Sequence, residues 1–228
     1  MGKVYPELDE RLRKFIARQS VFFVATAPSF AASGNADADG HVNGASGHID
    51  GAGQVDGAGL VNGAGHVNGA GHVNVSPKGY RGTFAVLGPT TVAYLDLTGS
   101  GAETIAHLRQ NGRITIMFCS FDRAPKILRL YGTGRVVTPG GPQWHELAAH
   151  FPTEGFGTNL ASRRAIILVE LERIADSCGY AVPIMELAAE RDVLATWGAR
   201  KSADELAAYR TAKNSVSIDG LPALAAQR

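Results

Sequence analysis

A hydroxyl group and an ammonium group stand close together in the segment HVNVSPKG, residues 72 to 79. Residues of alternating character predict a strand here, followed by Ser76, a proline turn and Lys78. A hydroxyl and an ammonium group near the end of a strand suit a phosphate group. Taken alone, Lys78 is better explained as a surface lysine after a turn. A phosphate site therefore requires support from a second segment.

That support comes from LDLTGSGAET, residues 95 to 104. A strand ends there in small residues at the start of a helix, where free backbone N–H groups and the helix dipole favour an anion. The side chains of Ser100 and Thr104 add hydroxyl donors. The alternative interpretation is an ordinary strand-to-helix turn that Ser100 caps. We expect the Lys78 ammonium group and the Ser100 hydroxyl to converge on one phosphate.

The order of the predicted elements determines where these residues lie. This order predicts a sheet-dominated α+β protein, in which closure into a small barrel would protect the strand edges. Helices are predicted within residues 1–20, at 101–112, around 142–151, and after a capping box formed by Ser202 and Glu205. β-Branched and aromatic residues predict strands at 20–28, 72–79, 91–99, 113–121, 126–137 and 164–177.

Between the first two predicted strands, residues 29–71 repeat a phrase close to GHVNGA with a period of six. We predict a mobile or weakly ordered loop inserted in the first hairpin, with a short hexapeptide solenoid as the ordered alternative. The spacing of the histidines follows the repeat rather than any metal-ligand geometry, so we predict no metal site. The side chains considered for such a site are His41, His48, His66, His72, Asp50 and Asp56.

Composition and length limit the class of protein and its partners. Lys+Arg 22 against Asp+Glu 21 gives a net charge of +1, which argues against a nucleic-acid partner. The 228 residues suit a single domain, 1–228, with 178–228 as a C-terminal helical extension. Residues 1–20 lack the apolar core of a signal peptide, and residues 165–171 are too short to cross a bilayer. We therefore expect a cytoplasmic protein with no membrane partner.

Three segments together resemble the flavin-binding split barrels of the pyridoxamine 5'-phosphate oxidase family: HVNVSPKG, TVAYLDLTGSGAETIAHLRQNGRITIMFCSF and KILRLYGTGRVV. The resemblance spans residues 15–28 and 72–175. It implies a six-stranded antiparallel split β-barrel with peripheral helices, whose strand–turn–helix segment holds the phosphate of FMN. It also implies a homodimer in which each flavin lies in a groove between the two protomers.

The resemblance assigns cofactor-binding roles to residues on three strands and one turn. The second strand matches the one that runs beside the isoalloxazine ring and reaches the phosphate, and the next strand and turn match further contacts. Arg129 matches a charged position in the same groove, although a structural ion pair explains it equally well. The residues implied are Asn74, Val75, Ser76, Lys78, Leu95, Asp96, Ser100, Gly101, Thr104 and Arg129.

Two departures from the family pattern bear on the activity. Gly101 and Ala102 stand where the oxidase has an Arg-Lys pair, so Lys78 must supply more of the attraction for a phosphate. The oxidase's C-terminal arginine and histidine motif has no counterpart here, which argues against pyridoxamine phosphate as the substrate. The sequence thus predicts an FMN-binding oxidoreductase acting on a small substrate or cofactor, with no assigned catalytic residue. The alternatives are a deazaflavin-dependent reductase and a non-catalytic flavin- or haem-binding module.

Overall fold

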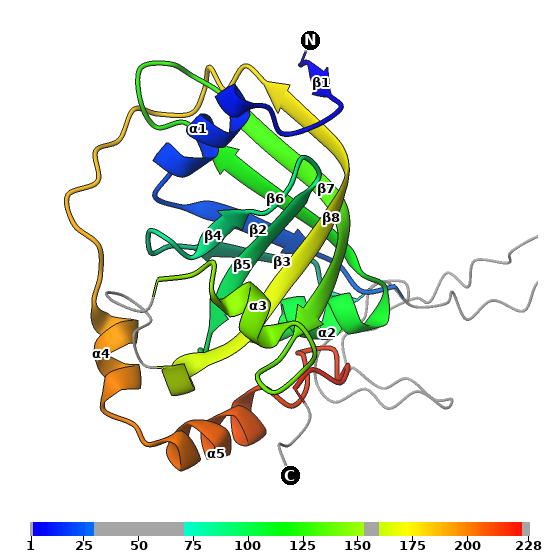
Figure 1. The fold of residues 1–228 in the computed structure, drawn as a ribbon, viewed down its shortest axis with the longest axis vertical. Helices are drawn as coiled ribbons and strands as arrows, with labels where there is room; N and C mark the ends of the chain where they lie inside the picture. The colour runs from blue at the N-terminus through cyan, green and yellow to red at the C-terminus, as the bar shows by residue number, and fades with distance from the viewer. Residues whose placement is uncertain (1, 30–70, 153–159, 225–228) are drawn as a thin grey trace, which may run out of the picture.

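An antiparallel sheet with the strand order β3-β2-β6-β7-β8-β5-β4 forms the body of the molecule (Figure 1). The computed structural model describes residues 2–29, 71–152 and 160–224. A further strand, β1, pairs with β8 beside this path. The strands are β1 (Val4–Tyr5), β2 (Phe22–Thr26), β3 (Asn74–Lys78), β4 (Phe84–Val86), β5 (Thr91–Leu97), β6 (Arg113–Cys119), β7 (Ile127–Val137) and β8 (Arg163–Ser177).

The helices lie around this sheet (Figure 1). The expected capping box at the start of α5 is present, because Ser202 Oγ accepts from Glu205 N and Glu205 Oε2 accepts from Ser202 N. Within the described ranges, no helix has the length and apolar character needed to cross a bilayer. The helices are α1 (Glu10–Arg18), α2 (Glu103–Gln110), α3 (Trp144–Ala148), α4 (Val193–Ala199) and α5 (Ala203–Lys213), with a 3-10 turn at Leu160–Ser162.

The predicted fold class, a sheet-dominated α+β split barrel, is confirmed, but the predicted number of six strands is wrong. The structure adds β1, with two residues, and β4, with three residues, to the predicted set. Segments this short cannot display the alternation of side chains by which a strand is recognised in a sequence. β4 extends the sheet beyond β5 and so forms one of its two edges.

The sheet curls until its edges approach each other. Lys78 of the edge strand β3 forms an ion pair with Asp96 of β5, close to the opposite edge. The rings of Phe22 and Phe84, on β2 and β4, also meet across the interior at 5.1 Å between centroids. Apolar side chains from α1, α2 and the strands fill the space between, including the fully buried Leu12, Ile105, Ile116, Leu130 and Ile167. The gap between β3 and the β4–β5 pair is where the barrel is split.

The strands on either side of the repeat pair with each other, as expected for the first hairpin. β2 and β3 are antiparallel, with Phe22 opposite Lys78 and Thr26 opposite Asn74. Residues 30–70 lie outside the described residues, and with them the predicted loop and the histidines and aspartates of the repeat. His72 is described: its Nδ1 lies 2.7 Å from Asp219 Oδ1, and its backbone N–H donates to Asp219 Oδ2.

Candidate functional site

A cavity of about 670 Å³ opens at the split, between β3, β5, the start of α2 and the coil that leads to α4. Of the residues that the sequence assigned to a cofactor, all except Asn74, Val75 and Arg129 line it. The predicted convergence of the two segments is therefore present in the fold. The predicted residues in the wall are Ser76, Lys78, Leu95, Asp96, Ser100, Gly101 and Thr104.

Strand β3 contributes Ser76, Pro77 and Lys78 to this wall. Successive side chains of a strand point to opposite faces, and Asn74, Ser76 and Lys78 are half-buried on one face. Val75 points the other way and is 61% exposed, so the structure does not bring its side chain to the cavity. Pro77 is compatible with this position because β3 lies at the edge of the sheet.

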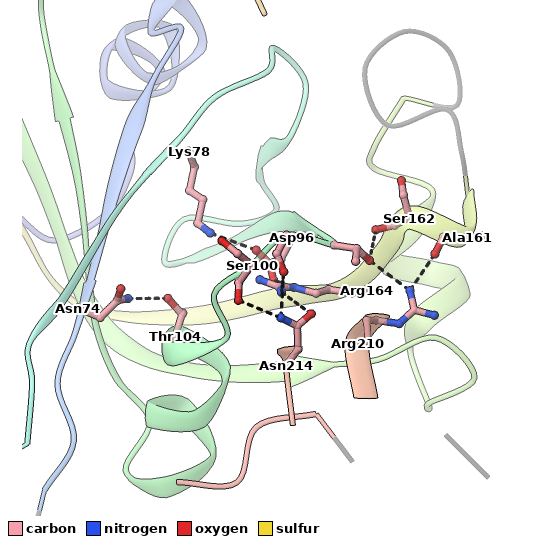
Figure 2. A network of polar contacts seen from close by, with 12 residues as sticks. Asn74, Lys78, Asp96, Ser100, Thr104, Ala161, Ser162, Arg164, Arg210 and Asn214 are labelled. Atoms are coloured by element: carbon pink, nitrogen blue, oxygen red, sulfur yellow. Dashed lines mark hydrogen bonds and ion pairs between the residues drawn. The ribbon is translucent and has the colours of Figure 1, made fainter. Parts of the chain in front are cut away.

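The cationic end of the cavity is organised around the buried carboxylate of Asp96 (Figure 2). Lys78 Nζ lies 3.1 Å from Asp96 Oδ1, and Arg164 Nε lies 2.7 Å from Asp96 Oδ2. Burial alone would raise the pKa of the Asp96 carboxyl, but the charges and hydrogen bonds of Arg164 and Lys78 outweigh it and lower the pKa below 3.8. Asp96 is therefore ionised at neutral pH, and the three groups together carry one net positive charge.

The two cations of this cluster have different roles. Arg164 is buried, and besides Asp96 its guanidinium donates to Gly99 O at 3.2 Å and to Asn214 Oδ1 at 3.0 Å. The N–H donors of Arg164 thus bond to groups of the protein rather than pointing at a ligand. Lys78 is 22% exposed in its side chain, and Asp96 takes one of the three N–H donors of its ammonium group. Lys78 is therefore the cation that is placed to contact a bound anion.

The start of helix α2 forms the wall beside Lys78. Its N-cap residue is Ala102, and no side chain caps the helix. The interpretation of Ser100 as a cap is therefore wrong, because the helix begins two residues later than a Ser100 cap would require; Ser100 is instead exposed on the cavity wall. Uncapped N–H groups at a helix start favour an anion. They add to the attraction that Lys78 exerts on the same space.

One negative charge lies at the same turn. The Glu103 carboxylate lies against Gly101 in the turn at the start of α2. A Cβ atom placed on Gly101 would be only 2.7 Å from Glu103 Oε2. The helix dipole favours a carboxylate in this place. A bound anion would have to displace this side chain, which is flexible and lies on the cavity wall.

A chain of hydrogen bonds leads from the cavity wall into the interior. Ser76 Oγ donates to Asn74 Oδ1 at 3.2 Å, and Asn74 Nδ2 donates to Thr104 Oγ1 at 3.0 Å and to Thr26 Oγ1 at 3.3 Å. Thr26 Oγ1 is hydrogen-bonded in turn to Nδ1 of His107, at 3.0 Å. Burial lowers the pKa of His107, so its imidazole is neutral near pH 7. Asn74, although it does not line the cavity, fixes the orientation of two hydroxyls that do.

The remaining wall comes from the coil before α4, which runs along one side of the molecule in Figure 1. It supplies Leu187, Ala189 and the charged residues Glu190 and Arg191, and the first turn of α4 adds Leu194. Glu190 Oε1 accepts from the backbone N–H of Arg81 at 3.3 Å, which ties this coil to the turn after β3. The cavity thus has a polar end and an apolar end.

Arg129 does not belong to this site. Its guanidinium Nη1 donates to Ser177 Oγ at 3.0 Å, within the β7–β8 pair, and its side chain does not line the cavity. This contact is structural, but it is a hydrogen bond to a serine and not the ion pair that was considered as the alternative. A local contact to Ser177 was not readable from the sequence, because it depends on the register of two strands that are far apart in the chain.

Sequence reasoning missed Arg164 and the cavity-lining residues 187–194, which lie in the coil before α4 and in its first turn. Arg164 was taken only as the start of a strand, because arginines beside an apolar run are ordinarily exposed; the structure instead buries Arg163 and Arg164, which are 3% and 6% exposed. Buried arginines require partners. The coil carries no motif, and its place beside the cavity follows only from the path of the chain after β8.

The fold and the cavity together define an antiparallel split barrel with a cationic, hydroxyl-bearing pocket at the split. A family model described as pyridoxamine 5'-phosphate oxidase matches residues 66–178. The chain is 34% identical over 236 aligned residues to the pyridoxamine 5'-phosphate oxidase family protein ustO of Aspergillus flavus, covering 96% of this chain and 77% of that one. The chain belongs to the pyridoxamine 5'-phosphate oxidase family.

Solved structures with a similar fold are much more distant in sequence. The haem storage protein HutZ from Vibrio cholerae is 15% identical, with a TM-score of 0.40, over 73% of this chain and 91% of that one. The FAD-binding protein from Mycobacterium smegmatis is 10% identical, with a TM-score of 0.39, over 77% of this chain and 96% of that one.

Proposed function

We propose that this protein is an FMN-binding oxidoreductase that acts on a small substrate or cofactor. The observation that carries the proposal is the convergence of Lys78, Ser100 and the uncapped start of α2 on one cavity. An ammonium group, a hydroxyl and backbone N–H donors together suit a phosphate monoester. Membership of the pyridoxamine 5'-phosphate oxidase family supports the flavin as the molecule that bears this phosphate.

The other residues of the cavity fit the rest of such a molecule. Asn74 orients the hydroxyls of Ser76 and Thr104: Ser76 donates to Asn74 and can accept a hydrogen bond from the polar edge of a ring system, whereas Thr104 accepts from Asn74 and can donate one. Leu187 and Leu194 add apolar surface to the cavity wall, which suits the apolar part of a bound ring. The flavin supplies electron transfer when bound, and the protein orients it and controls access. We assign no catalytic residue, because no side chain of the described cavity stands out as an acid or base.

The colour of the purified protein tests this proposal. We expect an absorption band at about 450 nm and release of FMN on denaturation, followed by turnover of a nicotinamide or quinone by the holoprotein. A colourless protein that takes up no added FMN would contradict the proposal. A band near about 420 nm would also contradict it, and would instead indicate a deazaflavin or haem.

We also propose that the protein is a homodimer. Support comes from apolar side chains that remain exposed at the start of β3 and on the coil after β8: Val73, just before β3, is 70% exposed, Val75 61%, Ile184 68% and Met185 60%. Such surfaces are typical of protein interfaces. Sedimentation velocity should give twice the chain mass for the wild type and a monomer for Val75→Asp. A monomeric wild type at micromolar concentration would refute the dimer.

A further inference from the structure

Asn214, at the end of α5, contacts the turn between β5 and α2 without lining the cavity. Asn214 is fully buried there, and both its amide nitrogen and its amide oxygen form hydrogen bonds (Figure 2). Its Nδ2 donates to Gly99 O at 2.9 Å and to Ser100 O at 3.4 Å, and its Oδ1 accepts from Arg164 Nη1 at 3.0 Å. A single side chain from the C-terminal segment therefore holds two successive carbonyl groups of the turn.

These two contacts determine the direction of the N–H groups that follow. In a trans peptide the carbonyl oxygen of one residue and the N–H of the next point in opposite directions, and the described residues contain no cis peptide. Because the oxygens of Gly99 and Ser100 point to Asn214, the N–H groups of Ser100 and Gly101 point away from it. Ser100 and Gly101 line the cavity, whereas Asn214 does not. Asn214 thus orients two backbone donors toward the cavity.

A second side chain of the same segment holds the residue before this turn. Arg210 Nη1 donates to Thr98 Oγ1 at 3.2 Å and to Ala161 O at 2.9 Å, and Thr98 Oγ1 donates to Ser162 O at 3.0 Å. The segment itself is anchored in the core, because Leu206, Ala223 and Leu224 are buried. Its position, and therefore that of Asn214, is fixed relative to the barrel.

We propose that Asn214 is a positioning residue of the anion-binding turn, and that docking of residues 203–224 and binding of a phosphate-bearing ligand stabilise each other. This inference rests on the proposed function, because it takes the phosphate of FMN as the anion. Asn214 needs no contact with the ligand for this effect. By linkage, a group that orients the site for the phosphate is itself held more firmly when the phosphate is bound.

Titration with FMN and with riboflavin, which lacks the phosphate, tests the role of Asn214. In Asn214→Asp the carboxylate keeps the bond from Arg164 but repels the carbonyl oxygens of Gly99 and Ser100. We expect about a tenfold weaker affinity for FMN and an unchanged affinity for riboflavin, since only the phosphate contacts are lost. The matched control is Asn111→Asp at the other end of α2, where the amide donates to Ala27 O; it should leave both affinities unchanged.

Hydrogen exchange of the wild-type protein gives a second readout that does not depend on the folding of a variant. FMN should slow exchange of the amides of 203–224, and riboflavin should not. If the wild type binds FMN but Asn214→Asp lowers both affinities equally, or FMN leaves exchange in 203–224 unchanged, the inference is wrong while the proposed function stands. If the wild type binds no FMN, the proposed function fails first.

Discussion

Asp96→Asn is expected to lower the free energy of unfolding by about 3–5 kcal/mol, the usual cost of breaking a buried ion pair. The substitution leaves Arg164, which is 5% exposed in its side chain, and the partly buried Lys78 without a counter-charge. It also frees the guanidinium that supports Gly99 and Asn214. We therefore expect loss of FMN binding together with loss of stability, both measurable by chemical denaturation with and without FMN.

The pH dependence of this effect separates the charge from simple packing. The folded pKa of Asp96 is lowered, so its contribution to stability is present above the unfolded value of 3.8 and is lost as the pH falls through the folded pKa. The difference between wild type and Asp96→Asn should shrink over that interval. Glu10→Gln, which breaks the exposed Glu10–Lys14 pair, is the control and should cost less than about 1 kcal/mol. A similar cost for both variants would contradict the buried role of Asp96.

The parts of the fold that were predictable from the sequence are those with a long, regular pattern. The apolar alternation in β6 and the residues of α1 that face the core mark their elements without any knowledge of the neighbours. Strand β4 was missed because its three residues carry no period. The pairing of β8 with β5 and β7 could not be predicted from the sequence either, because the register between distant segments follows from tertiary packing.

In the candidate site, too, the residues within a short sequence motif were predictable, and the contacts between distant segments were not. Ser76, Lys78 and Ser100 were predictable because each lies at a strand end or turn whose chemistry is visible in a short window. Asn214 carried no such signal, because its buried contact with Gly99 joins two segments that are far apart in the chain. The resemblance placed Arg129 in the same groove, but its side chain does not line the cavity, because the position of a strand residue depends on which face the strand presents.

Lys78→Ala is expected to weaken FMN binding by about 10- to 100-fold, the range for loss of a charged hydrogen bond. The substitution should be tolerated by the fold, because Asp96 keeps its ion pair with the buried Arg164. Lys126→Ala is a closely matched control: Lys126 is 23% exposed in its side chain, against 22% for Lys78, and it also pairs with a carboxylate, that of Asp176. It lies outside the cavity and should not alter the affinity for FMN.

The most direct test of phosphate binding at the split of the barrel is a titration of wild type and Lys78→Ala with both FMN and riboflavin, followed by flavin fluorescence. We expect the wild type to prefer FMN by at least about tenfold, and Lys78→Ala to lose most of that preference while its affinity for riboflavin is unchanged. Equal affinity of the wild type for the two flavins, or a preference that survives the loss of Lys78, would contradict the assignment of this cavity.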